Sequence, residues 1–196
     1  MSTRNLVIVV IIATILILGG CGCSGYNSMV QRDENVKAKW GTVQSNYQRR
    51  ADLIPNLVST VKGAADFEQE TLTRVIEARA KATSVNVNTG DLSPEKIAQF
   101  QQAQGELSGA LSRLLVSVER YPELKANQNF LDLQKQLEGT ENRITVARND
   151  FNTSVQDYNG AVRRFPSNIF AGMFGFQVRQ GFTAEEGSER APQVQF

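Results

Sequence analysis

The chain has 196 residues, and its 21 Lys and Arg against 20 Asp and Glu give a formal net charge of +1. This balance provides no overall field that would attract a polyanion, so nucleic acid is not an expected partner. The sequence contains no histidine, which removes the commonest metal ligand and the side chain that titrates near neutral pH. Both cysteines, Cys21 and Cys23, end an apolar stretch, so the rest of the chain has no thiol for catalysis, metal binding or a disulfide.

Residues 1–25 contain an apolar segment that runs from Leu6 to Gly20 without a charge and follows Arg4. This pattern is typical of a segment that inserts into a membrane. Its roughly fifteen to twenty residues lie between the length of a signal-peptide core and that of a minimal spanning helix. We therefore predict an N-terminal membrane anchor.

The end of this segment leaves two kinds of anchor open. Leu18-Gly19-Gly20-Cys21 resembles the lipobox of bacterial lipoproteins, in which the peptide is cut before the cysteine and a lipid is attached to its sulfur. The alternative is an uncleaved single-pass helix with Cys21 near the membrane interface. The short basic start favours a location of the remaining chain outside the cytoplasm, held at the bacterial cell membrane.

Apolar and small residues recur at steps of three and four from Val36 to Ile76, which predicts helices with one buried stripe. Pro55 lies within this stripe, where proline removes a backbone hydrogen bond and clashes with the carbonyl of Ala51. Two structures fit: a kinked continuous helix, or two helices that meet near residues 50–52 with Pro55 in the first turn of the second. We divide the pattern into helices over 26–51 and 55–83.

Two further helices are predicted over 94–121 and 127–165. Ser93-Pro94-Glu95 has the residue types of an N-cap, a first helical position and an acidic first turn, and Pro122 ends the pattern. Asn127 is a candidate cap for the last helix, and Pro166 closes it. A seven-residue apolar repeat on helices with short connections predicts an all-α fold, an up-and-down bundle of four long helices over residues 26–166 behind the anchor.

The C-terminal part divides into an apolar segment over 167–182 and a tail over 183–196. The segment includes Phe170, Met173, Phe174 and Phe176, and it is too short to span a bilayer. It could fold back on the bundle, dock into a second copy or a partner protein, or contact the membrane interface. The tail is rich in Gly, Glu, Ser and Pro, and we expect it to be disordered.

Charged residues beside the stripes predict a polar layer within the bundle. We expect Glu141 to meet an arginine, Arg50 or Arg79, with Arg148 also in the layer, and to fix the register of the helices. A pocket for an anionic head group is the alternative. Carboxylates such as Glu138 and Glu141 raise the question of a metal in the bundle core, but the usual ligand set there includes histidine. We predict no metal, no cofactor and no catalytic residues.

The segment Arg49-Arg50-Ala51-Asp52-Leu53-Ile54-Pro55-Asn56-Leu57-Val58 resembles the LemA family of bacterial membrane proteins. The resemblance covers nearly everything after the anchor, although the Gly-Gly-Cys-Gly-Cys end of the anchor departs from the plain single span usual in the family. It implies an N-terminal membrane segment and a four-helix bundle, and it brings no established enzymatic activity, cofactor or catalytic residues. Further matching blocks are Tyr26-Asn27, Asp33-Glu34-Asn35-Val36, Trp40, Val75-Ile76-Glu77-Ala78-Arg79, Tyr121-Pro122-Glu123-Leu124-Lys125-Ala126-Asn127, Leu133-Gln134, Gln136-Leu137-Glu138-Gly139-Thr140-Glu141-Asn142-Arg143-Ile144, Ala147-Arg148, Tyr158-Asn159, Phe165-Pro166 and Gly175-Phe176.

These observations predict a membrane-anchored, non-enzymatic helical scaffold of the bacterial envelope that binds protein partners or itself. The apolar residues from Phe170 to Phe176 and the exposed helix faces would supply the contacts. The alternative is a sensor or carrier that binds a small ligand or lipid in a bundle cavity. An envelope hydrolase would need a nucleophile and a base that the sequence does not offer.

Overall fold

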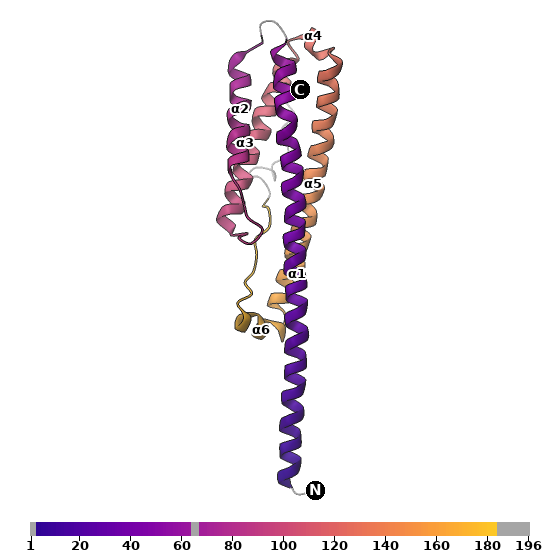
Figure 1. Ribbon diagram of the computed structural model, residues 1–196, viewed down its shortest axis with the longest axis vertical. Helices are drawn as coiled ribbons and strands as arrows, with labels where there is room; N and C mark the ends of the chain where they lie inside the picture. Colours follow the sequence, from indigo (N-terminus) through magenta and orange to yellow (C-terminus); the bar gives the residue numbers. More distant parts are fainter. Residues whose placement is uncertain (1–2, 64–66, 184–196) are drawn as a thin grey trace, which may run out of the picture. The chain divides into compact units, whose positions relative to one another are not determined.

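The structure is a computed structural model that describes residues 3–63 and 67–183, and within them all regular structure is helical (Figure 1). The predicted all-α class is confirmed, since these residues contain no strand. The tail predicted over 183–196 lies outside the described residues from 184 onward, and so do the side chains of residues 9–11, 14–21 and 23. The helices are α1 Thr3–Lys62, α2 Gln69–Ser84, α3 Pro94–Val118, α4 Pro122–Lys125, α5 Gln128–Arg163 and α6 Ser167–Phe174.

The described residues form two compact units. Unit 1 contains the residues up to Asn46 together with Ile144–Arg179, and unit 2 contains Tyr47–Arg143 with the residues from Gln180. The long helices α1 and α5 each contribute to both units, so the division falls within these helices.

Helix α1 continues through Pro55 and ends at Lys62, so the separate helices expected over 26–51 and 55–83 are not observed. Proline at position 55 cannot donate the backbone hydrogen bond that the carbonyl of Ala51 would otherwise accept. Arg79 on α2 supplies the missing donor, because its Nε lies 2.8 Å from the oxygen of Ala51. A cation from the neighbouring helix thus satisfies the carbonyl that the proline leaves open.

The starts of α3 and α5 show how far the predicted capping signals hold. Pro94 occupies the start of α3, but Ser93 at the N-cap makes no side-chain capping hydrogen bond. The amide oxygen of Asn127 accepts a hydrogen bond from the backbone N–H of Phe130 at 3.2 Å, as expected for the cap of α5. The short helix α4 between them was not expected from the sequence.

The core of unit 2 consists of apolar side chains from α1 to α5, most of which lie on the predicted stripes, whereas Leu57 and Leu124 are buried outside them. Within it, α2 and α3 pack along each other as a helical hairpin. Ile76 is an error of the sequence prediction, because it is exposed while Val75 fills the buried position next to it. The cluster includes Ile54, Leu57, Val61, Leu72, Val75, Leu107, Leu111, Leu114, Val118, Leu124, Phe130 and Leu137.

Unit 1 is built on α1 and α5. The rings of Trp40 and Phe151 are fully buried, and their centroids lie 5.2 Å apart. Lys39 and Asp150 pair at the surface of the same two helices at 2.8 Å. Buried aromatic pairs of this kind contribute large apolar areas to a core.

The predicted membrane segment forms the first part of α1. Its described side chains from Leu6 to Ile8 and Ile12 are about half exposed. In the parts of the chain that the structure describes, no helix combines the length and the apolar character needed to cross a bilayer.

The contact between Arg79 and Ala51 generates a prediction about stability. Arg79→Met removes the side-chain donor of a carbonyl that faces a proline, so we expect a loss of about 1–2 kcal/mol in the free energy of unfolding. In a Pro55→Ala background the N–H of residue 55 can donate to the carbonyl of Ala51 in place of Arg79. The destabilisation caused by Arg79→Met should then be smaller by about 1 kcal/mol. Urea unfolding of the four variants measures the coupling.

Arg74→Met is the matched control, because Arg74 lies on the same helix and pairs with the exposed Glu70 in i,i+4 spacing. Its effect should stay within about 0.5 kcal/mol in both backgrounds. Equal losses for Arg79→Met with and without Pro55 would contradict this role of Arg79.

Candidate functional site

The most unusual side chain of unit 2 is Arg50, a cation with only 1% of its side chain exposed. It lies on α1 within the helical pattern that buries Tyr47, Ile54 and Leu57. Burial of a guanidinium requires that nearby acceptors replace the water it loses.

These acceptors come from α3 and α5. Nη1 donates to Oγ of Ser108 and to Oε1 of Glu141, both at 2.7 Å. Nη2 donates to Oε1 of Gln104 at 2.6 Å and to its backbone oxygen at 3.2 Å. The guanidinium also lies 5.0 Å from the ring centroid of Tyr47, close enough for a cation–π contact.

The layer also reaches α2, since Nε2 of Gln104 donates to the backbone oxygen of Ala82 at 3.3 Å. Side chains or backbone of α1, α2, α3 and α5 therefore meet at one level of unit 2. A slip of α1, α3 or α5 would separate the buried cation from some of its acceptors, which is strongly destabilising for a buried charge. A slip of α2 would break the hydrogen bond between Gln104 and Ala82. The arrangement can fix the register of the helices.

The sequence pointed to Arg50 and Glu141 but missed Gln104 and Ser108. Gln104 is the one polar residue in the otherwise apolar stripe of α3, and this interruption was the available signal. Arg79 does not join the layer, because it binds the backbone of Ala51. Arg148 lies in the part of α5 that belongs to unit 1, where it is partly buried.

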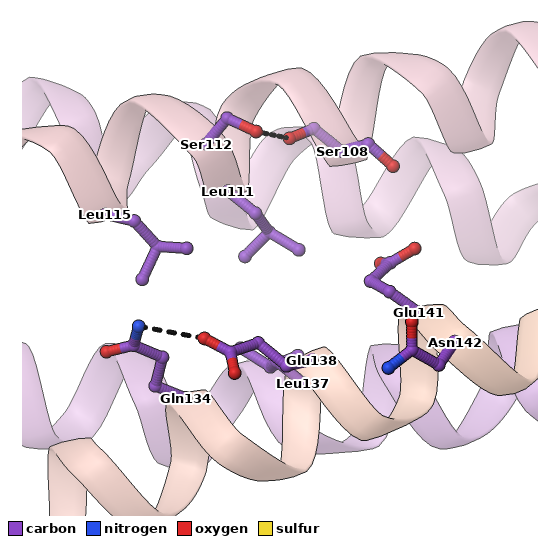
Figure 2. Close-up of a pocket in the computed structure, with 9 residues that line it drawn as sticks. All are labelled: Ser108, Leu111, Ser112, Leu115, Gln134, Leu137, Glu138, Glu141 and Asn142. Atoms are coloured by element: carbon purple, nitrogen blue, oxygen red, sulfur yellow. Dashed lines mark hydrogen bonds between the residues drawn. The ribbon is translucent and has the colours of Figure 1, made fainter.

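A groove of about 540 Å³ opens between α3 and α5 beside this layer (Figure 2). Its apolar side is formed by leucines, and polar side chains surround them. On α5, Nε2 of Gln134 donates to Oε1 of Glu138 at 3.0 Å, and Glu141 reaches from the groove toward Arg50. The lining residues are Ser108, Leu111, Ser112, Leu115, Gln134, Leu137, Glu138, Glu141 and Asn142.

The carboxylates of the groove do not form a metal site by themselves. Among the described residues, no group of three or more Cys, Asp and Glu side chains is placed to hold a metal ion. Glu141 engages Arg50, and Glu138 engages Gln134. The groove can accept an amphipathic group through its leucines and its polar rim.

In unit 1, the chain that follows α6 is fastened by the side chains of Asp33, Asn159 and Arg179. The guanidinium of Arg179 binds the carboxylate of Asp33 at 2.7 and 2.8 Å. The side-chain amide of Asn159 pairs with both the N–H and the C=O of Arg179 at 2.8 Å, as a neighbouring strand would. We call these three residues the Arg179 clamp.

Two neighbours of the clamp have shifted pKa values. Burial, followed by the charge of Asp33, raises the pKa of Tyr158, whose ring lies 5.6 Å from the guanidinium carbon of Arg179. The hydrogen bond to Glu34, followed by the one to Asp33, raises the pKa of Lys37. Both shifts favour the protonated forms at neutral pH, so these two side chains do not change charge there.

Helix α6 contacts α1 through its aromatic residues. Phe170 lies against Gly22, where an added Cβ would come within 3.0 Å of the ring. The ring centroids of Phe174 and Phe176 lie 5.0 and 5.7 Å from that of Tyr26. Met173 remains exposed. The side chain of Cys21, the residue considered for lipidation, lies outside the described residues.

The long helices and the buried arginine layer define an all-helical protein whose charged groups join its elements. The model of the LemA family matches residues 39–196, so the chain belongs to this family. The resemblance seen in the sequence is thereby confirmed.

Relatives of known name are distant. The chain is 26% identical over 176 residues to magnetosome protein MamQ 2 of Paramagnetospirillum magneticum, which covers 80% of this chain and 64% of the relative. It is 27% identical over 171 residues to magnetosome protein MamQ of Magnetospirillum gryphiswaldense, with 78% and 62% covered. Protein LemA of Metamycoplasma hominis is 24% identical over 149 residues, with 75% and 64% covered. The chain thus spans less than two thirds of the length of these relatives.

The pairing of Glu141 with Arg50 generates a second prediction. Glu141→Gln keeps the shape but removes the charge that faces Arg50, and 46% of the Glu141 side chain is exposed, so solvent screens part of the effect. We expect a loss of about 1–2 kcal/mol in the free energy of unfolding, measured by urea denaturation.

Glu138→Gln is the matched control, because Glu138 lies three residues away on α5 at the surface and bonds to Gln134. Its effect should remain within about 0.5 kcal/mol. A Glu141→Gln variant as stable as this control would contradict the prediction, and it would show that the hydrogen bonds to Gln104 and Ser108 are sufficient to stabilise the buried Arg50.

Proposed function

We propose that this protein is a membrane-anchored, non-enzymatic helical scaffold of the bacterial envelope, which presents a rigid surface to protein partners or to further copies of itself. One observation carries the proposal: no loop separates the apolar start from the packed part of unit 1. Both belong to α1, which includes the exposed Leu6 and Ile12 as well as the buried Val36 and Trp40. An anchor made by this segment would pass directly into the folded unit.

The membrane part of the proposal is supported by exposed apolar side chains at the start of α1. Leu6, Val7, Ile8 and Ile12 are all about half exposed along this part of the helix. A stretch of large, exposed aliphatic side chains favours lipid as its surroundings. A single-pass helix and a lipid on Cys21 are both compatible with this proposal.

The scaffold part is supported by the way unit 2 uses its charged residues. Hydrogen bonds between helices engage the polar side chains of Arg50, Arg79, Gln104 and Glu141, so these side chains stabilise the packing of the helices. We infer that α1, α2, α3 and α5 form an up-and-down four-helix bundle at this level. Membership of the LemA family and similarity to relatives named as magnetosome proteins support a role at bacterial membranes.

The anchoring proposal leads to a third prediction. Ile8→Lys combined with Ile12→Lys places two charges in the apolar segment, and each costs about 2.5–3.5 kcal/mol near the centre of a bilayer. The wild-type chain should sediment with membranes after carbonate extraction, whereas the double variant should be released. Crosslinking in intact cells followed by mass spectrometry should recover protein partners or self-association with the wild-type chain and lose them with the released variant.

Val146→Lys serves as the control, because Val146 is an exposed apolar residue on α5 in the same unit. It should remain in the membrane fraction. A wild-type chain that washes off, or one that crosslinks to no protein at all, would contradict the proposed function.

The groove between α3 and α5 favours a second candidate function, a sensor or carrier of a small amphiphile. Its volume of about 540 Å³ and its leucine side with a polar rim suit a ligand with one apolar part. Native mass spectrometry of the purified chain should then detect a bound molecule. Ser112→Trp would fill the groove and abolish that signal, whereas Ser45→Trp at an exposed position of α1 would keep it. A chain that carries no bound molecule would rule out this candidate.

A further inference from the structure

We propose that α6 is an interfacial helix, which inserts its exposed apolar side chains into the head-group region of the bilayer that holds the start of α1. This inference rests on the proposed membrane anchor and assigns a partner, the lipid surface, to a second part of unit 1. Four features of that unit support it: the position of α6, its exposed residues, the charges that precede it in the chain and the Arg179 clamp that follows it.

The position of α6 along α1 is fixed by aromatic contacts. Phe170 packs on Gly22, and Phe174 packs on Tyr26, one helical turn further along α1. Gly22 comes four residues after Leu18, the last large aliphatic residue of the apolar segment, which is a distance of about 6 Å along a helix. The polar interface on each side of the hydrocarbon core is about 5–8 Å thick. Helix α6 therefore lies at the level where α1 would leave the lipid.

The apolar residues of α6 form two adjacent rows. Phe170 and Phe174, spaced by four residues, face α1, whereas Ile169 and Met173 form a parallel row that is exposed. Met173 exposes 73% of its surface, and Phe174 remains about half exposed despite its contact with Tyr26. Large apolar side chains gathered on a helix of eight residues are unfavourable in water and typical of helices that lie in a membrane interface.

Two basic residues precede α6 in the chain. Arg163 is the last residue of α5 and Arg164 follows it, shortly before α6 begins at Ser167, and both arginines are exposed. Bacterial membranes contain anionic lipids, which attract Arg and Lys placed near the surface. A basic pair next to exposed aliphatic and aromatic side chains has the composition of an interfacial segment, since each part meets its preferred layer of the bilayer.

The Arg179 clamp keeps this row on one face. The backbone of Arg179 is paired with Asn159, and its side chain is paired with Asp33, so the chain on the far side of α6 returns to α5 and α1. Gly175 permits that return, because it ends α6 in the left-handed conformation with φ of 77°. Helix α6 is thus held at both ends while Ile169 and Met173 remain exposed.

A fluorescence experiment on the full chain tests the proposal. The chain is reconstituted into vesicles of phosphatidylcholine and phosphatidylglycerol that contain a lipid spin-labelled just below the head group. Met173→Trp reports on α6, and Val146→Trp is the matched control, since Val146 is also an exposed apolar residue of unit 1. Val146 lies on α5 one turn from Asp150, which pairs with Lys39 at a level of α1 about 25 Å beyond Gly22. The buried Trp40 gives the same background in both variants.

We expect the spin label to quench the introduced tryptophan about threefold more in Met173→Trp than in Val146→Trp, as for a side chain at interfacial depth. Arg163→Gln combined with Arg164→Gln should reduce that difference in anionic vesicles. Ile169→Trp provides a second reporter on the same row and should be quenched as strongly as Met173→Trp. Circular dichroism before reconstitution verifies that each variant is folded.

Flotation of the same samples separates the two proposals. If the chain floats with the vesicles but Met173→Trp is quenched no more than Val146→Trp, α6 is not interfacial and the membrane anchor stands. If the chain does not float, the anchor fails and the role of α6 fails with it. A blue shift of the Met173→Trp emission that depends on protein concentration and not on vesicles would show that a second copy covers this face, which also overturns the proposal.

Discussion

The structure of unit 2 depends on how one buried cation is satisfied. A buried guanidinium such as that of Arg50 is tolerable only if acceptors from several elements converge on it. Gln104, Ser108 and Glu141 supply those acceptors from α3 and α5, and Gln104 extends the network to α2. Apolar stripes alone allow neighbouring helices to slide by a turn, whereas a directional network of this kind defines a single alignment.

A second constraint acts one turn further along α1. Pro55 leaves the carbonyl of Ala51 without its helical donor near the end of a long helix, and Arg79 from α2 supplies a donor in its place. The two arginines have different tasks, since one is surrounded by side chains of unit 2 and the other binds the backbone of its neighbour. The segment from Arg49 to Val58 therefore combines a helix defect with the contacts that make the defect compatible with a packed interior. This combination explains why a proline can stand there without ending the helix.

Much of the fold could be predicted from the sequence because helical periodicity records which face is buried. The stripes on α3 and α5, the cap at Asn127 and the pairing of Glu141 with an arginine all follow from patterns of residue type and spacing. Other features could not be predicted, because they depend on which neighbour is present. Helix α1 continues through Pro55 at the level where Arg79 of α2 donates a hydrogen bond to the carbonyl of Ala51. On α2, Val75 is buried in the core in place of its neighbour Ile76. Cys21 could not be assigned to either kind of anchor, because sequence signals for cleavage and for spanning overlap in that segment.

Unit 1 joins chain segments that are far apart in sequence, and this has a consequence for biosynthesis. Its parts come from the residues up to Asn46 and from Ile144–Arg179, whereas the main apolar cluster of unit 2 runs from Ile54 to Leu137. A ribosome that makes this chain synthesises that whole cluster before it begins the second half of unit 1. The first half of unit 1 must therefore wait, with Trp40 uncovered, until synthesis reaches Phe151. Early capture of the amino-terminal segment by a bilayer would protect the nascent chain during that interval.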